Sequence, residues 1–199
     1  MDLARRELAA WCVGDARLAP HDDLVLARRI LERYAPRDEA QAQERERMLA
    51  FVDAHPCDAH RRTLLVGHLT ASALVVDRAR GAALLTHHRK LSRWLQLGGH
   101  CDGDANLIGV ALRECVEESG IAELAIDPEP LDLDVHTIPV RANEPEHLHL
   151  DTRFVVFAPP HARAVLSDES HELRWVTPSE LDELSTDASV RRLFDLVFA

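Results

Sequence analysis

Residues 99–121 decide the fold, and they read GHCDGDANLIGVALRECVEESGI. A loop rich in glycine and aspartate is followed by apolar residues at helical spacing, which predicts a helix from about residue 105 to residue 119. Asp104 is placed to cap the amino end of this helix, and Gly120 to end it in the left-handed conformation. The sequence therefore predicts a flexible loop that leads directly into a well-capped helix.

Three carboxylates crowd one face of this predicted helix. Glu114, Glu117 and Glu118 stand at i, i+3 and i+4, a spacing at which like charges repel by about 0.2–0.5 kcal/mol per pair. A bound divalent cation would remove this repulsion. Because all the ligand atoms are oxygens, a hard cation such as Mg²⁺ or Mn²⁺ suits them better than zinc does. The three glutamates alone leave open the alternative of an ordinary solvated helix face.

The residues around these glutamates resemble the Nudix box, the signature of the Nudix hydrolase family. In that pattern a glycine, five residues, a glutamate and seven residues precede Arg-Glu-apolar-x-Glu-Glu-x-Gly-apolar. The chain fits the pattern without a gap from Gly99 through Arg113 to Ile121. The exception is Ala105, which stands where the box has its first glutamate.

The resemblance implies an enzyme that hydrolyses a diphosphate linkage in a nucleoside diphosphate derivative, for instance a nucleotide sugar such as ADP-ribose. It also implies Mg²⁺ or Mn²⁺ as the cofactor. Glu114, Glu117 and Glu118 match the positions that bind metal and supply the catalytic base. Arg113 matches the position that orients these glutamates, and the carbonyl of Gly99 matches a further metal contact.

Two glutamate positions of the family pattern stay open in this chain. The family often recruits one more glutamate from a loop before a later strand, for which Glu169 is the candidate and Glu172 the runner-up. At Ala105, either Asp102 or Asp104 substitutes from the same loop, or catalysis is reduced or lost. The alternatives to a hydrolase are a non-catalytic ligand-binding or regulatory module of the same fold, and an isoprenyl-diphosphate isomerase. For the isomerase, no distinguishing cysteine pattern is evident.

Histidines and basic residues outside the box are candidate substrate contacts. His87 and Arg89 lie in the one clearly basic stretch near the box, where a phosphate could bind. His147, His149 and Asp151 alternate along a predicted strand and so share one face, where His149 and Asp151 are proposed to contact substrate. Two histidines and a carboxylate could also hold iron or zinc. Two further histidines flank segments that lead toward the predicted pocket, namely His68 and His100.

The remaining pattern favours an α+β fold, a mixed-sheet α/β/α sandwich of the Nudix kind, because strands and helices mix without regular βαβ alternation. Strands are predicted at residues 67–77, 82–88, 94–97, 131–140, 148–157 and 173–176, and closing helices at 178–184 and 189–198. Residues 1–60 predict a helical N-terminal extension, with helices at about 2–12, 24–34 and 38–54. Residues 61–199 then form the hydrolase-like domain.

Charge and composition narrow the partners. The chain has 199 residues, with 23 Lys+Arg against 34 Asp+Glu and a net charge of −11, which disfavours nucleic acid duplexes but not a small diphosphate delivered with cations. No apolar run approaches the roughly 18–20 residues of a membrane span, and no signal peptide is evident. Four cysteines without a Cys-x-x-Cys motif predict reduced thiols and a cytoplasmic protein. The apolar stripe at residues 48–52 is compatible with a homodimer.

Overall fold

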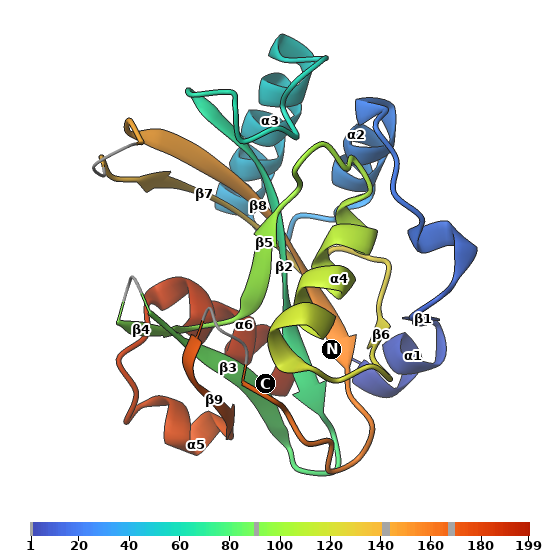
Figure 1. Ribbon diagram of the computed structural model, residues 1–199, viewed down its shortest axis with the longest axis vertical. Coiled ribbons are helices and arrows are strands. Elements are labelled where there is room, and N and C mark those ends of the chain that lie inside the picture. Colours follow the sequence, from blue (N-terminus) through green and yellow to red (C-terminus); the bar gives the residue numbers. More distant parts are fainter. Residues whose placement is uncertain (1, 90–91, 141–143, 167–169) are drawn as a thin grey trace.

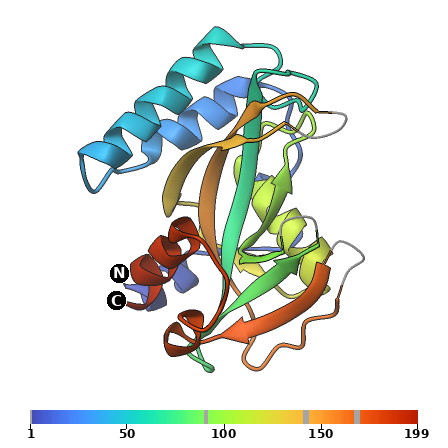
Figure 2. The ribbon, with the colours of Figure 1, turned by 90° about the vertical axis from the view of Figure 1, so that its left-hand side faces the viewer.

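The computed structural model describes residues 2–89, 92–140, 144–166 and 170–199. A mixed β-sheet forms its centre, with helix α4 (Leu107–Ser119) on one face and helix α6 (Ala188–Phe198) on the other (Figure 2). The short helices α1 (Leu3–Leu8) and α5 (Pro178–Leu181) lie near α6 (Figure 1). This arrangement confirms the predicted α/β/α sandwich.

The sheet is organised around strand β2 (Gly67–Asp77), which is buried along its whole length. It pairs in parallel with β8 (His147–Phe157) and antiparallel with β3 (Ala82–His88) and β5 (Leu97–His100). The order of the main path is β1-β6-β8-β2-β3-β4, while β7 pairs with β8 and β9 with β3. The bounds of the other strands are β1 (Trp11–Cys12), β4 (Arg93–Leu95), β6 (Ala125–Ile126), β7 (Asp132–Ile138) and β9 (Ser170–Val176).

Alternation of side chains along β2 separates two apolar clusters. Leu69, Ala71 and Val75 belong to the cluster that contains the buried face of α4. Leu74 and Val76 point the other way and pack in the cluster that contains α6. Both faces of this strand are covered at residues 73–76, where its sequence is continuously apolar, as a central strand requires.

The N-terminal helices share the core of the sheet. Helix α2 (Leu24–Arg33) and helix α3 (Glu39–Ala54) pack against each other, and α3 also packs on β7. Buried residues of both helices join the cluster that contains α4. Met48 and Val52 are among them, so the stripe at residues 48–52 is used within the chain and is not a free surface for dimerisation. The domain boundary near residue 60 and the homodimer both stay predictions.

The first predicted helix is wrong at its carboxyl end. Helix α1 stops at Leu8, and the chain then forms β1, in which Trp11 pairs with Ile126 of β6. A two-residue strand is too short to show a periodic pattern in the sequence. It forms only because a partner strand lies beside it, more than a hundred residues away along the chain. A 3₁₀ turn, η1 (Ala16–Leu18), follows. No helix among the described residues is long and apolar enough to cross a membrane.

Candidate active site

Helix α4 begins and ends through local capping. Its N-cap is Asn106, whose side chain accepts a hydrogen bond from the Gly109 backbone N–H at 3.3 Å, so the prediction of Asp104 is wrong by two residues. The Asn106 amide also donates to the carbonyls of Arg17 and Ala19, which fastens the N-terminal extension to the start of the helix. Gly120 ends the helix with φ of 66°, as predicted. The box helix is therefore held at both ends.

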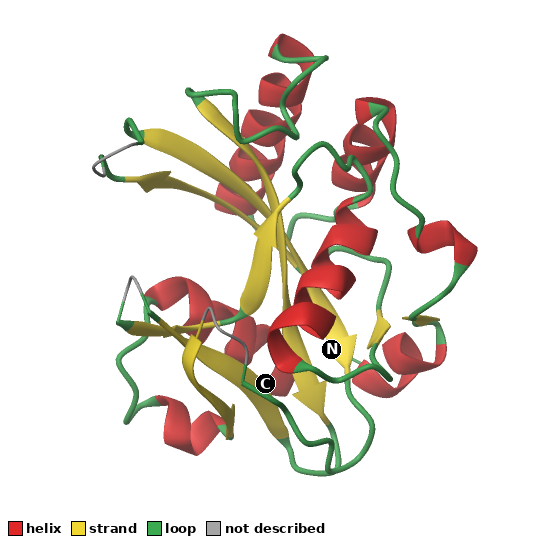
Figure 3. Ribbon diagram, in the orientation of Figure 1, coloured by secondary structure: helices red, strands yellow, loops and turns green. Residues whose placement is uncertain are grey.

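A cavity of about 470 Å³ lies beside this helix. The strands that surround it form two arms, with β7 and β8 on one side and β3 and β4 on the other (Figure 3). Glu114 and Glu118 of α4, together with Gly98 and Gly99 of β5, form part of its lining. Six histidines also line it: His68, His88, His100, His136, His147 and His149. Glu117 is exposed and is not part of this lining.

Gly99 allows the box helix to approach the sheet closely. A Cβ atom on this residue would lie 2.3 Å from Oε2 of Glu114, a separation that no side chain tolerates without movement. The half-buried carboxylates of Glu114 and Glu118 thus share one wall with the backbone of β5. Carboxylate and carbonyl oxygens are the donors that Mg²⁺ and Mn²⁺ prefer, so these residues fit a hard divalent cation.

Arg113 is paired with Asp104, which lies one residue before Ala105. Its guanidinium lies 3.2 Å from Oδ2 of Asp104 and 3.4 Å from Oε1 of Glu114. The other oxygen of Asp104 accepts from the backbone N–H of His21 at 3.0 Å. Asp102, the other candidate from the sequence, is instead paired with Arg62 at the surface. Of the two candidate aspartates of this loop, Asp104 is therefore the one that contacts Arg113.

This pairing makes a prediction for Ala105, which is fully buried. We expect Ala105→Glu to lower stability and not to raise kcat, because it would bury a second carboxylate where Arg113 already has a partner. We expect Asp104→Asn to lower kcat by about tenfold, a positioning effect of roughly 1.4 kcal/mol. Asp102→Asn should change kcat much less. Steady-state kinetics and urea unfolding of the three variants measure these effects, and a higher kcat in Ala105→Glu would refute the assignment.

His149 and Asp151 both line the cavity, beside His147. They share a face of β8, as the spacing predicts. The Asp151 carboxylate is 4% exposed and accepts hydrogen bonds from Thr70 at 3.1 Å and Ser72 at 2.7 Å. Asp151 therefore joins β8 to β2 across the floor of the cavity.

The two predicted phosphate contacts, His87 and Arg89, do not line the cavity. His87 is turned to the opposite side of β3, where its ring lies 5.2 Å from that of Trp94, because successive side chains of a strand alternate. Its neighbour His88 lines the cavity instead. Arg89 is exposed in the turn after β3. Glu172 pairs with His87 across β3 and β9, which places it on that same opposite side, while Glu169 lies outside the described residues.

Burial keeps the central histidines of the cavity neutral. It lowers the pKa of His149 to about 2 and that of His68 to about 4, with help from neighbouring histidines, and it also lowers the pKa of His100. His136 differs: burial opposes its protonation, but the hydrogen bond to Asp134 and the charges of Asp151 and Asp134 together outweigh burial and raise its pKa. The basic stretch at the end of the second predicted strand includes His88, but the sequence does not identify His136 as a cavity residue. Alternation places His136 on the same face of its strand as Asp132 and Asp134. It does not indicate which strand lies beside them, so it cannot place His136 in the cavity.

A family model described as NUDIX domain matches residues 67–197. The chain belongs to the Nudix domain family. This membership confirms the resemblance seen in residues 99–121, and it assigns the chain to the Nudix-type pyrophosphohydrolases. The matched region begins with β2 and ends within α6, so the N-terminal helices lie outside it.

Solved structures support the Nudix fold. The structure of an Ap4A hydrolase from C. elegans, in a binary complex, superimposes with a TM-score of 0.53 at 16% identity, covering 64% of this chain and 93% of that one. The dihydroneopterin triphosphate pyrophosphohydrolase of E. coli also has a TM-score of 0.53, at 14% identity, covering 71% of this chain and 98% of that one. At these identities the likeness concerns the fold alone. No curated protein matches the chain.

Proposed function

We propose that this Nudix protein hydrolyses the diphosphate linkage of a nucleoside diphosphate derivative with Mg²⁺ or Mn²⁺ as cofactor. The observation that carries the proposal is that Glu114, which lies against Gly99, and Glu118 both line the cavity. Glu117, at the exposed edge of the same helix, would complete the ligand set. Glu169 is proposed as a further ligand on its sequence position alone.

The chemistry of the proposed reaction divides between the cofactor and the chain. When bound, divalent cations screen the phosphate charge and lower the pKa of a coordinated water. The carboxylates of Glu114 and Glu118 hold the cations and can accept the proton of the attacking water. Arg113 contacts Glu114 and is itself held by Asp104, so the carboxylate is oriented before substrate enters. His149 is the proposed substrate contact across the cavity, where its neutral ring adds no charge of its own.

A panel of diphosphate substrates tests the proposal. We expect the full chain with Mg²⁺ or Mn²⁺ to cleave at least one of ADP-ribose, other nucleotide sugars and dinucleoside polyphosphates, because the acidic wall accepts phosphate only together with cations. The products should be a nucleoside monophosphate and a phosphorylated remainder, identified by phosphorus NMR and chromatography. ADP-ribose is the substrate that we propose first.

Two other results would replace the hydrolase. Binding of a nucleotide without turnover of any substrate in the panel would establish the non-catalytic module. Isomerisation of isopentenyl diphosphate without release of phosphate would establish the isomerase. Among the described residues, the lining of the cavity contains no cysteine that could act in an isomerase, since Cys101 and Cys115 are buried outside it. Burial also raises the pKa of both thiols.

A further inference from the structure

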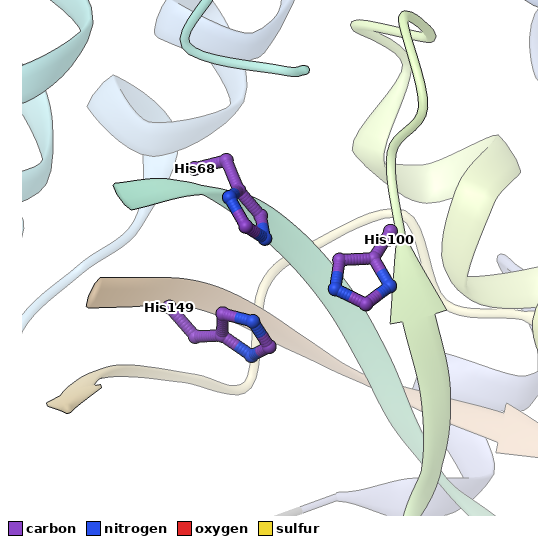
Figure 4. A group of neighbouring side chains, drawn as sticks. All are labelled: His68, His100 and His149. Atoms are coloured by element: carbon purple, nitrogen blue, oxygen red, sulfur yellow. The ribbon is translucent and has the colours of Figure 1, made fainter. Parts of the chain in front are cut away.

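Three histidines from three adjacent strands meet on one face of the sheet inside the cavity. His68 of β2 is the register partner of His149 on the parallel strand β8. His100, at the end of β5, pairs with Thr70, two residues further along β2 on the same face as His68. Figure 4 shows the three rings turned toward one another. The three histidines are brought together by the pairing of β2 with β8 and with β5, and not by a local sequence motif.

The distances between these rings describe a nearly equilateral triangle. The ring centroid of His68 lies 4.9 Å from that of His149 and 5.1 Å from that of His100. The centroids of His100 and His149 are also 5.1 Å apart. One nitrogen from each ring lies within 4.8 Å of the other two. In a tetrahedral site with metal–nitrogen bonds of about 2.0–2.1 Å, the nitrogens are about 3.4 Å apart. Small side-chain rotations therefore suffice to close the triangle on one ion.

His68 is the member of the group that most needs a ligand. It is 3% exposed, and its ring has only a poorly aligned contact with the Leu64 backbone, so neither ring nitrogen makes a hydrogen bond of good geometry among the described residues. A buried polar side chain without a partner is rare in folded proteins and usually marks a bound water, an ion or a functional role. His149 differs, because its Nε2 lies 3.3 Å from Nε2 of His147, a neighbour that can orient its ring.

We propose that His68, His100 and His149 bind a divalent transition-metal ion of the Zn²⁺ class, at a site separate from the glutamates of the box. Imidazole nitrogens select zinc, cobalt or nickel over magnesium, whereas the carboxylates of Glu114 and Glu118 select the hard cation. The chain thus presents two donor sets of different hardness in one cavity.

The three histidines leave the fourth position of a tetrahedral ion open toward the cavity. Catalytic zinc sites commonly have three protein ligands and one exchangeable position of this kind. An anionic oxygen of the bound diphosphate would occupy it, opposite the cations held by the box. This role in substrate binding rests on the proposed hydrolase function, whereas the metal site itself does not.

Titration with Co²⁺ tests the site without any substrate. The full chain is stripped with a chelator, dialysed and titrated with Co²⁺ in excess Mg²⁺, which occupies the carboxylates. We expect one equivalent to bind with the visible absorption of a four-coordinate ion, and Zn²⁺ to displace it. Because loss of an outer-shell partner already weakens metal binding by about 10–100-fold, His100→Ala and His149→Ala should each weaken it by about 100-fold or more.

Matched variants separate this site from the box. His55→Ala, at the carboxyl end of α3 and outside the cavity lining, should keep full Co²⁺ affinity, and so should Glu118→Gln. Near-ultraviolet circular dichroism confirms that each variant is folded. If His149→Ala does not fold, His100→Ala tests the site by itself, because His100 is only half-buried. Absence of stoichiometric Co²⁺ binding, or unchanged affinity in folded His100→Ala, overturns the proposal. Stoichiometric binding without turnover of the panel would instead retain the site and remove the hydrolase.

Discussion

Glu118→Gln and Glu114→Gln are each expected to lower kcat by about 10³-fold with the best substrate of the panel. Glutamine keeps the shape of the side chain but loses the charge that holds a divalent cation and the basicity that accepts a proton from water. Loss of a positioned general base alone lowers rates by about 10²–10⁴-fold. Because both carboxylates line the cavity beside Gly99, neither can be replaced by the exposed Glu117.

The controls for these variants lie on the same stretch of chain. Glu123→Gln changes an exposed glutamate just beyond the helix and should leave kcat unchanged. Glu117→Gln should lower kcat less than Glu118→Gln and more than Glu123→Gln, since Glu117 is on the box helix but outside the cavity lining. Single-turnover kinetics at saturating Mg²⁺ separate the chemical step from metal loading. Full activity in Glu118→Gln at any Mg²⁺ concentration would disprove the assignment of the box.

Arg153→Met is expected to lower the free energy of unfolding by about 3–5 kcal/mol, the usual effect of removing one partner from a buried ion pair. The guanidinium of Arg153 is 2% exposed and lies 2.9 Å from Asp134, 3.0 Å from Asp151 and 3.4 Å from Asp132. Burial opposes ionisation of Asp134, but the hydrogen bond from His136 and the charge of Arg153 hold the pKa of its carboxyl well below its usual range. Without Arg153, Asp132 and Asp134 keep the charge of Arg192 beside them, whereas Asp151 keeps only the hydrogen bonds from Thr70 and Ser72.

Urea unfolding followed by tryptophan fluorescence measures this effect. Arg191→Met is the matched control, because Arg191 neighbours Arg192 on α6 but, within the part of the chain that the structure describes, pairs with Asp182 at the surface and not with the buried carboxylates. Exposed pairs contribute about 0–1 kcal/mol, so the control should unfold close to the wild-type midpoint. A loss below about 1 kcal/mol in Arg153→Met would show that the buried network is replaceable.

Elements with a strong local signal were predicted well. Residues 67–77 and 82–88 form β2 and β3 with those bounds, since segments rich in Val, Thr and Leu and the turn between them are properties of the local chain. Helix α4 ends at Gly120 as its left-handed glycine requires. The amino end of the same helix was misplaced, because Asp104 and Asn106 are both good caps. The choice depended on Asp104 being drawn toward Arg113 and His21.

Elements that depend on distant partners were not predicted. The segment at residues 94–97 was expected to be one strand, but β4 pairs with β3 and β5 pairs with β2, so the chain changes neighbours at Gln96. The candidate contacts divided in the same way. His149 and Asp151 follow from alternation along one strand, whereas the side of the sheet that His87 faces depended on how β3 pairs.

The sequence by itself determined the family and the acidic wall, because Glu114, Glu117 and Glu118 lie on consecutive turns of one helix and need no other element to bring them together. Only the tertiary structure decided that Asp104, and not Asp102, contacts Arg113, and that the histidines of β2, β5 and β8 form a triangle. The physical reason is register. Residues three or four apart share a helix face without help from distant parts of the chain. The pairing of strands far apart in the chain depends instead on the packing of the whole sheet.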